Sequence, residues 1–344
     1  MKEYPLIAEA HNLSIGYKGK RGANAVVHSG INFSLHGGEL VCLLGANGAG
    51  KSTLLRTMAV VQPALVGDIS LMGSPCQSYS ERERSRLIGI VLTERTHAGG
   101  LTVRELVALG RQPYTGFFGR LNKVDEEKID YAIQAVGMCN KAGSYVAELS
   151  DGERQKAMIA KALVQECPLI LLDEPTAFLD VVSRIEIMTL LHKLAVEEGR
   201  AILLSTHDVE QALVLADKLW LLSKESGLVC GNTEDLILSN AMDKLFPHEE
   251  ICFDLLHGGY SPVVHGDKCL LLTAADDVLL HWTRNALNRN GWHGADARNE
   301  ELAQDMPRLE VRSADCLLLT SEGKTHTYTT FQQMLDALKN HYSE

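Results

Sequence analysis

The chain has 344 residues and a formal net charge of -11 at pH 7. That length predicts one large domain and a smaller one, and an acidic balance without a Lys/Arg-rich cluster argues against a nucleic-acid partner. No apolar run approaches the roughly 20 residues that cross a bilayer, no signal-peptide pattern opens the chain, and the eight cysteines contain no CxxC pair. We therefore expect a cytosolic protein whose cysteines are small buried hydrophobes.

The first chemical motif is a glycine-rich loop that follows a predicted buried strand, ELVCLL (39–44), and precedes a predicted helix, STLLRTMAV. The loop, GANGAGKST (45–53), fits the phosphate-binding pattern G-x-x-x-x-G-K-[ST]. Its glycines let backbone N–H groups approach a phosphate, and Lys51 can reach the outer phosphate oxygens. The Ser52 hydroxyl is suited to Mg²⁺. The strand and the helix supply the context that makes this a nucleotide loop.

Helices are predicted next along the chain. Thr102 and Glu105 form a capping box in TVRELVALG, and DEEKIDYAIQAVGM places apolar residues at 129, 133 and 136. The polar stretch LSDGE (149–153) then leads into the helical run RQKAMIAKALV, with Ser150 and Asp151 as possible N-caps.

A second strand carries two acids in the stretch CPLILLDEPTAFLD (167–180). Asp173 can hold Mg²⁺ through water, and Glu174 can polarise an attacking water as a general base. A predicted helix (181–198) follows, and then a buried strand, AILLSTHD, that ends at His207. Its place at the end of this βαβ series favours a contact of His207 with a phosphate.

Together these residues resemble the nucleotide-binding subunits of ABC transporters over roughly residues 5–255. The resemblance implies an α/β fold, with a P-loop ATPase core at 1–247 and a helical subdomain at about 88–165. It implies ATP and Mg²⁺ as cofactors, Tyr17 stacked on adenine, and Glu174, His207 and Lys51 as catalytic residues. LSDGE corresponds to the family signature, which covers the γ-phosphate bound to a second subunit packed head to tail.

The implied nucleotide-binding residues are Tyr17, Gly45, Ala46, Asn47, Gly48, Ala49, Gly50, Lys51, Ser52, Thr53, Ser150, Gly152, Glu153 and Asp180, the last in the loop that bridges two subunits. The implied metal ligands are Ser52, Asp173 and Glu94.

Two positions depart from the common pattern of the family. The signature is usually LSGGQ, whereas Asp151 and Glu153 replace a glycine and the glutamine here. The glutamine of the loop that joins core and helical subdomain corresponds to Glu94, or to Thr93 after a shift of one residue. A carboxylate near the partner's phosphate repels it unless the carboxylate points away or meets Arg154 or Lys156. We expect Asp151 to point away and cap its helix.

The stretch LTVRELVALGRQPYTGFFG resembles subunits of importers for iron–siderophore, haem and cobalamin cargo. The resemblance therefore implies a homodimer of ATPase subunits, integral membrane permease subunits and, indirectly, a substrate-binding protein as partners. It places the chain at the cytoplasmic face of the inner membrane as a peripheral subunit.

The resemblance ends near residue 247, and residues 248–344 are predicted to form a small α+β accessory domain with a regulatory role. Strand-like runs EICFDLL, KCLLLT, RLEVR and DCLLLTS alternate with two helices. The first, DDVLLHWTRNALNRNG, has apolar positions 279, 282, 286 and 287; the second, TFQQMLDALKNHY, starts at a capping box of Thr330 and Gln333.

Two other functions compete with an importer ATPase. A soluble ABC-type ATPase of DNA repair or translation typically has two cassettes in one chain or a long coiled coil, and this chain has one cassette and no sustained heptads. A P-loop kinase or GTPase would need a substrate lid or a guanine-reading NKxD motif, and would leave LSDGE and His207 unexplained.

Overall fold

The computed structural model describes residues 4–19, 24–92, 100–116, 118–246, 248, 250–255, 257–263, 266–296 and 306–341. The chain divides into two compact units. The first comprises Met1–Pro247 and Phe253–Tyr260, and the second comprises His248–Cys252 and Ser261–Glu344. Within the described ranges, every helix is too short or too polar to cross a bilayer.

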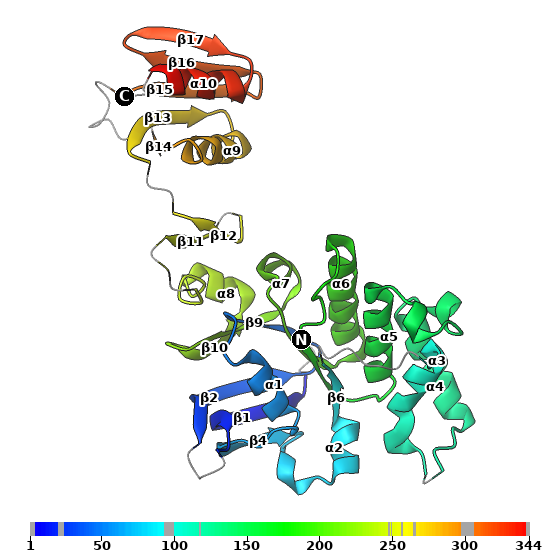
Figure 1. The fold of residues 1–344 in the computed structure, drawn as a ribbon. Helices are drawn as coiled ribbons and strands as arrows, with labels where there is room; N and C mark the ends of the chain where they lie inside the picture. The colour runs from blue at the N-terminus through cyan, green and yellow to red at the C-terminus, as the bar shows by residue number, and fades with distance from the viewer. Residues whose placement is uncertain are drawn as a thin grey trace. The chain divides into compact units, whose positions relative to one another are not determined.

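A six-stranded sheet forms the centre of the first unit (Figure 1). Its strands are, in spatial order, β10 (Gly227–Asn232), β9 (Lys218–Ser223), β3 (Leu40–Leu44), β8 (Ala201–Ser205), β7 (Leu169–Asp173) and β6 (Ile88–Val91). All neighbours pair in parallel except β10, an antiparallel edge. Parallel strands covered on both faces read as continuous apolar runs, which is why β3, β7 and β8 were recognisable in the sequence.

A second, antiparallel sheet covers one face of this centre. It contains β2 (Ala25–His36), β1 (Leu6–Tyr17), β4 (Val66–Leu71) and β5 (Ser74–Pro75). Leu43 of β3 packs there in one hydrophobic cluster with Leu13, Ile31 and Leu54. Leu54 lies on α1 (Lys51–Met58), the helix predicted after the glycine loop. The core therefore fixes α1, whose first residue is the loop's lysine.

Helices cover the other face of the six-stranded sheet, where Leu40, Cys42 and Leu44 join a separate cluster. The helices of the unit are α1, α2 (Glu81–Leu87), α3 (Val103–Ala108), α4 (Lys123–Ala135), α5 (Asp151–Leu163), α6 (Val181–Glu198), α7 (Val209–Leu215) and α8 (Thr233–Leu238), with short 3₁₀ segments such as η2 (Leu109–Tyr114) and η3 (Cys139–Lys141). The predicted box of Thr102 and Glu105 is confirmed. So is the buried face of α4, with Ile129 and Ile133. In Figure 1, α3, α4 and α5 group together as a helical part of the unit.

The second unit is a five-stranded sheet with two helices. Its strands are, in spatial order, β14 (Trp292–Asp296), β13 (Lys268–Ala274), β15 (Arg308–Ser313), β16 (Cys316–Ser321) and β17 (Lys324–Tyr328). Leu272, Leu309 and Leu319 pack against α9 (Asp277–Asn288) and α10 (Phe331–His341) in a core of their own. A short hairpin of β11 (Ile251–Asp254) and β12 (Gly259–Pro262) precedes this sheet in the sequence.

Two expectations about buried side chains were wrong. Trp282 was expected on the apolar face of its helix but is 59 % exposed, and the buried polar Thr283 lies on that face instead. Of the cysteines, Cys42, Cys76 and Cys167 are buried, whereas Cys139, Cys230, Cys252 and Cys269 are exposed. An apolar run leaves part of its residues at the surface where it lies on an edge strand, on a short connection or at the end of a strand, as Cys269 does, so the run alone overstates burial.

Candidate functional site

The glycine loop lies where β3 ends and α1 begins, at the carboxyl edge of a parallel sheet. Gly50, the residue before α1, has φ 100°, a conformation that L side chains rarely adopt. Gly45 lies so close to β9 that a Cβ would meet the Leu222 carbonyl oxygen at 2.4 Å. Both glycines are therefore required by the local backbone, which curls around the start of α1 and leaves its first N–H groups as anion donors.

Lys51 folds back over this loop. Its Nζ donates to the carbonyl oxygens of Gly45, at 2.8 Å, and Ala46, at 3.3 Å. His207 Nε2 lies 3.4 Å from the same ammonium group. Burial lowers the pKa of Lys51, and the nearby carboxylates of Glu174 and Asp173 oppose this shift. The ammonium group is thus held at the loop beside the ends of β7 and β8.

Asp173 is surrounded by hydroxyl groups. Ser52 Oγ donates to Asp173 Oδ1 at 3.1 Å, and Ser205 Oγ donates to the same oxygen at 2.8 Å. Mg²⁺ prefers hard oxygen ligands and keeps several waters. A hydroxyl from α1 facing a carboxylate from β7 fits that preference, so the residues present are suited to the predicted metal.

Glu174 follows Asp173 directly and contacts His207. Glu174 Oε1 lies 2.7 Å from His207 Nε2, and the Glu174 N–H donates to Ser205 Oγ at 2.9 Å. The structure therefore brings the four predicted residues Lys51, Asp173, Glu174 and His207 to one edge of the sheet. A carboxylate fixed there beside an imidazole and an ammonium group is placed to orient a water molecule against a phosphate.

Tyr17 ends β1 close to the loop, and its hydroxyl lies 3.0 Å from Thr53 Oγ1. The side chain is 53 % exposed, so its ring is accessible to a planar ligand. Stacking on adenine stays a prediction. Glu94 and Thr93, the two candidates for the coupling-loop position, lie outside the described residues.

The signature stretch begins α5. Ser150 is the N-cap, and it forms a capping box with Glu153. Asp151, which was expected to cap the helix, is instead its first residue and pairs with Arg154 at 2.7 Å. The capping expectation for Asp151 was wrong. Ser150, one residue earlier, has the extended backbone of an N-cap, and its hydroxyl accepts from the Glu153 N–H.

Asp180 and Gly152 both lie close to Ser183, in the first turn of α6. Asp180 is the N-cap of this helix and accepts from Ser183 N at 2.9 Å and from Ser183 Oγ at 3.1 Å. These hydrogen bonds, the backbone one first, hold the pKa of Asp180 below its usual range. A Cβ on Gly152 would lie 3.2 Å from Ser183 Oγ. The signature therefore lies close to the first turn of α6, the helix that Asp180 caps, within one chain.

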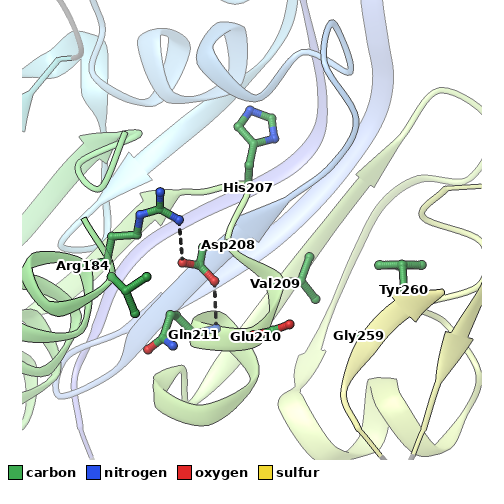
Figure 2. Close-up of a pocket in the computed structure, with 9 residues that line it drawn as sticks. Arg184, His207, Asp208, Val209, Glu210, Gln211, Gly259 and Tyr260 are labelled. Carbon is green, nitrogen blue, oxygen red and sulfur yellow. Dashed lines mark hydrogen bonds and ion pairs between the residues drawn. The ribbon is translucent and has the colours of Figure 1, made fainter. Parts of the chain in front are cut away.

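A pocket of about 380 Å³ lies beside His207 and is lined by residues that include Arg184, Asp208, Glu210 and Tyr260. Figure 2 shows Arg184 and Asp208 pointing toward each other, with 3.5 Å between their charged atoms. Asp208 also accepts from the Gln211 N–H as the N-cap of α7. The residue that follows His207 is thus held from two sides, which fixes the backbone that presents the imidazole.

Two residues of the site were missed in the sequence. Ser205 contacts both acids, and His28 donates from Nε2 to the carbonyl oxygen of Ala49, inside the loop, at 2.6 Å. In the parallel register Ser205 pairs with Asp173. The sequence signal that could have indicated Ser205 was its place as a polar residue at the carboxyl end of β8, two residues before His207. His28 is itself one of the buried positions of β2, and a buried histidine in a strand does not by itself point to the loop.

Comparison with known proteins places these features in context. The family described as ABC transporter matches residues 28–177, and the family described as iron ABC transporter C-terminal domain matches residues 271–339. An uncharacterized ABC transporter ATP-binding protein of Methanocaldococcus jannaschii is 40% identical, over 74% of this chain and 84% of its own length. The ferric enterobactin transport ATP-binding protein FepC of Escherichia coli is 36% identical, over 68% of this chain and 84% of its own.

A solved structure agrees with the fold of the first unit. CbiO1 of Clostridium perfringens, described as part of the ABC transporter complex cbiONQ, superposes with a TM-score of 0.60 at 26% identity. The superposition covers 70% of this chain and 94% of that one.

Proposed function

Because this chain belongs to the ABC transporter ATP-binding proteins of the iron-siderophore and cobalamin importer type, we propose that its first unit hydrolyses Mg-ATP at a site shared by two copies. The chain is an ATPase subunit whose hydrolysis is coupled to the import of an iron chelate or cobalamin. The name of the Escherichia coli relative and the iron-transporter match of the second unit support an iron chelate as the cargo.

One observation carries the mechanism: Ser52 and Ser205 both donate to Asp173 Oδ1, beside the Glu174–His207 pair. Ser52 and Asp173 would hold Mg²⁺, which neutralises phosphate charge when bound. Lys51 and the first N–H groups of α1 bind the phosphates. Glu174 orients the attacking water, and His207 holds the Glu174 carboxylate and faces the terminal phosphate.

The shared site rests on the signature. Within the described residues, Ser150 makes its side-chain hydrogen bonds to Glu153 of the same helix, and Gly152 faces α6. These contacts are thus with α5 and α6, and none of them is with residues 45–53 of the same chain. We propose that a second copy, packed head to tail, brings its loop to this signature. Membrane permease subunits at the cytoplasmic face, supplied by a substrate-binding protein, complete the importer.

The nucleotide assignment is tested by Lys51→Ala. Removal of the ammonium group leaves the phosphate charge uncompensated, so we expect ATP hydrolysis to be abolished. The matched control is Lys123→Met, because Lys123 is 91% exposed at the start of α4. Phosphate release by the purified protein is the measurement. Turnover that is unchanged in Lys51→Ala would sink the assignment.

The general-base role and the dimer are tested together by Glu174→Gln. We expect this variant to bind ATP but to hydrolyse it at least ~10²-fold more slowly, as removal of a positioned base should. ATP should then trap a dimer, which size-exclusion chromatography with light scattering detects. A monomer at saturating ATP counts against the shared site. Copurification with a permease tests the importer itself.

A further inference from the structure

Two carboxylates lie in the first turn of α5, where the family pattern has a glycine and a glutamine. Glu153 Oε2 accepts from Ser150 N at 3.0 Å and from Ser150 Oγ at 3.2 Å. Asp151, next to Ser150, is 56% exposed on its side chain. Negative side chains at a helix start stabilise the helix itself. They also oppose the approach of any further anion, and the hydroxyl of Ser150 is the group on which a phosphate would be received.

Each of these carboxylates has its own cation. Arg154 Nη1 lies 2.7 Å from Asp151 Oδ1, and Arg154 Nη2 donates to the Leu149 carbonyl oxygen at 3.0 Å. Lys141 Nζ lies 3.4 Å from Glu153 Oε1. Lys141 ends η3, an element separate from α5. Helical spacing therefore explains the first pair but not the second, which the tertiary fold brings together.

Glu153 carries its charge at neutral pH. The hydrogen bond from the Ser150 backbone, and then that from its hydroxyl and the charge of Lys141, outweigh the slight burial and hold the pKa of Glu153 below its usual value. Its carboxylate is thus ionised and fixed beside Ser150. The charge must be balanced before an anion can approach the start of α5.

We propose that Lys141 and Arg154 are positioning residues that neutralise the two signature carboxylates, so that the start of α5 receives the γ-phosphate of ATP bound to a second copy of this chain. This inference rests on the head-to-tail dimer of the proposed function. The two pairs replace the neutral glycine and glutamine of the common signature by balanced charges. Loss of either cation leaves one net negative charge facing the incoming phosphate, and like charges across an interface oppose association strongly.

The test measures the ATP concentration that gives half-maximal dimer in a Glu174→Gln background. Lys141→Met should raise this concentration about tenfold or more, because the uncompensated Glu153 repels the phosphate. Adding Glu153→Gln to Lys141→Met removes the repelling charge and should return the ATP concentration for half-maximal dimer to within about threefold of the parent value. Arg154→Met and its rescue by Asp151→Asn form a second, independent series. Lys123→Met, which removes an equal charge elsewhere in the helical part, should leave the value unchanged.

Two further readouts separate electrostatics from folding. The defect of Lys141→Met should shrink as salt is raised, because salt screens exposed charges. The melting temperature without nucleotide should stay near that of the parent, because an exposed ion pair contributes little to stability. A defect that Glu153→Gln does not relieve, or that is independent of salt, overturns the proposal. If the Glu174→Gln parent forms no dimer at any ATP concentration, the shared site of the proposed function is wrong. If the parent dimerises and Lys141→Met dimerises at the same ATP concentration, only the role given to Lys141 is wrong.

Discussion

Among single residues, Ser205 links Asp173 and Glu174, the two acids of the site. It is fully buried, donates to Asp173 Oδ1 at 2.8 Å and accepts from Glu174 N at 2.9 Å. A hydroxyl that bridges a side chain and a neighbouring backbone group fixes both the proposed metal ligand and the peptide that carries the proposed base. The role of Ser205 is to position these groups, since its own contacts are to protein atoms.

We expect Ser205→Ala to raise the Mg²⁺ concentration needed for half-maximal ATP hydrolysis and to lower kcat. The change leaves the half-buried Glu174 N–H without its acceptor, which also costs about 1 kcal/mol of unfolding free energy. Ser223→Ala is the matched control, because Ser223 is a buried serine at the end of β9 in the same sheet, and within the described residues its hydroxyl accepts from the N–H groups of Glu225 and Ser226. A Mg²⁺ dependence that shifts equally in both variants would contradict the role given to Ser205.

A site residue could be predicted from the sequence when its role was fixed by residues close to it in the chain. Lys51, Ser52, Asp173 and Glu174 stand in local patterns whose chemistry is fixed within a few residues, and the structure brings them together. The contacts of Ser205 depend on the parallel register between strands far apart in sequence. Sequence spacing holds no record of such a register. The same holds for Lys141 and Glu153, which meet through the tertiary fold.

Among the elements, η2, α4 and the end of α5 are held together by one buried arginine. Arg111 Nε lies 2.9 Å from Asp125 Oδ1, and Nη1 lies 2.8 Å from the Val164 carbonyl oxygen and 2.9 Å from Glu166 Oε2. The guanidinium also stacks over the ring of Tyr114 at 3.9 Å. Burial alone would raise the pKa of Asp125, but hydrogen bonds from the Asn122 backbone and from Arg111 hold it below its usual value.

We expect Arg111→Met to lower the unfolding free energy at pH 7 by about 3–5 kcal/mol, because it leaves Asp125 buried without its cation. The wild-type contribution of Asp125 is complete above its unfolded pKa of about 4 and is lost as the pH falls through the lower folded value. The variant instead raises the folded pKa of Asp125, so its deficit should narrow as the pH falls toward 4. Urea unfolding at several pH values measures the loss of unfolding free energy at pH 7 and its decrease toward pH 4.

The control for this series is Arg104→Met, because Arg104 on α3 pairs with Glu126 and Asp130 of α4 at the protein surface. Exposed pairs contribute about 0–1 kcal/mol. An equal loss in both variants, or a deficit for Arg111→Met that does not change with pH, would refute the assigned role of the buried pair.

Helices with a cap in their sequence were predicted better than short polar strands. Thr102, Ser150 and Thr330 each stand three residues before an acid or an amide, and helices begin beside all three. The strands β14 and β17, with sequences WHGAD and KTHTY, were not predicted. Both are edge strands. β17 is exposed at all but its last residue, and Trp292 supplies the large buried apolar side chain of β14, so neither sequence shows a run of apolar residues.

At the scale of the whole molecule, each unit has its own hydrophobic core. Phe253 and Tyr260 belong to the first unit, although the sequence predicted that everything after residue 247 belongs to the accessory domain. The Tyr260 hydroxyl donates to the Met242 carbonyl oxygen at 2.6 Å, and its ring centre lies 4.9 Å from that of Phe246. Aromatic contacts of this kind bury large apolar area, which attaches Tyr260 to the core of the first unit.

We expect two variants of the full chain to affect different unfolding transitions. Tyr260→Ala should destabilise the first unit, whose transition is the one that Mg-ATP shifts upward, because a bound ligand stabilises only the unit that holds it. Leu309→Ala should cost the second unit about 2–5 kcal/mol, because Leu309 is fully buried in its core. Calorimetry with and without Mg-ATP distinguishes the transitions. If Leu309→Ala lowers the ATP-sensitive transition as much as Tyr260→Ala does, the two cores are not independent.

The backbone of Glu174 has a consequence for protein engineering. Its φ is 50°, in the left-handed region that costs a residue other than glycine or asparagine about 1 kcal/mol or more. Glycine at 174 would relieve this strain and remove the proposed base in one step. A library selected only for heat resistance would therefore enrich inactive sequences at this position, so any thermostability screen of this protein has to include turnover as a second criterion.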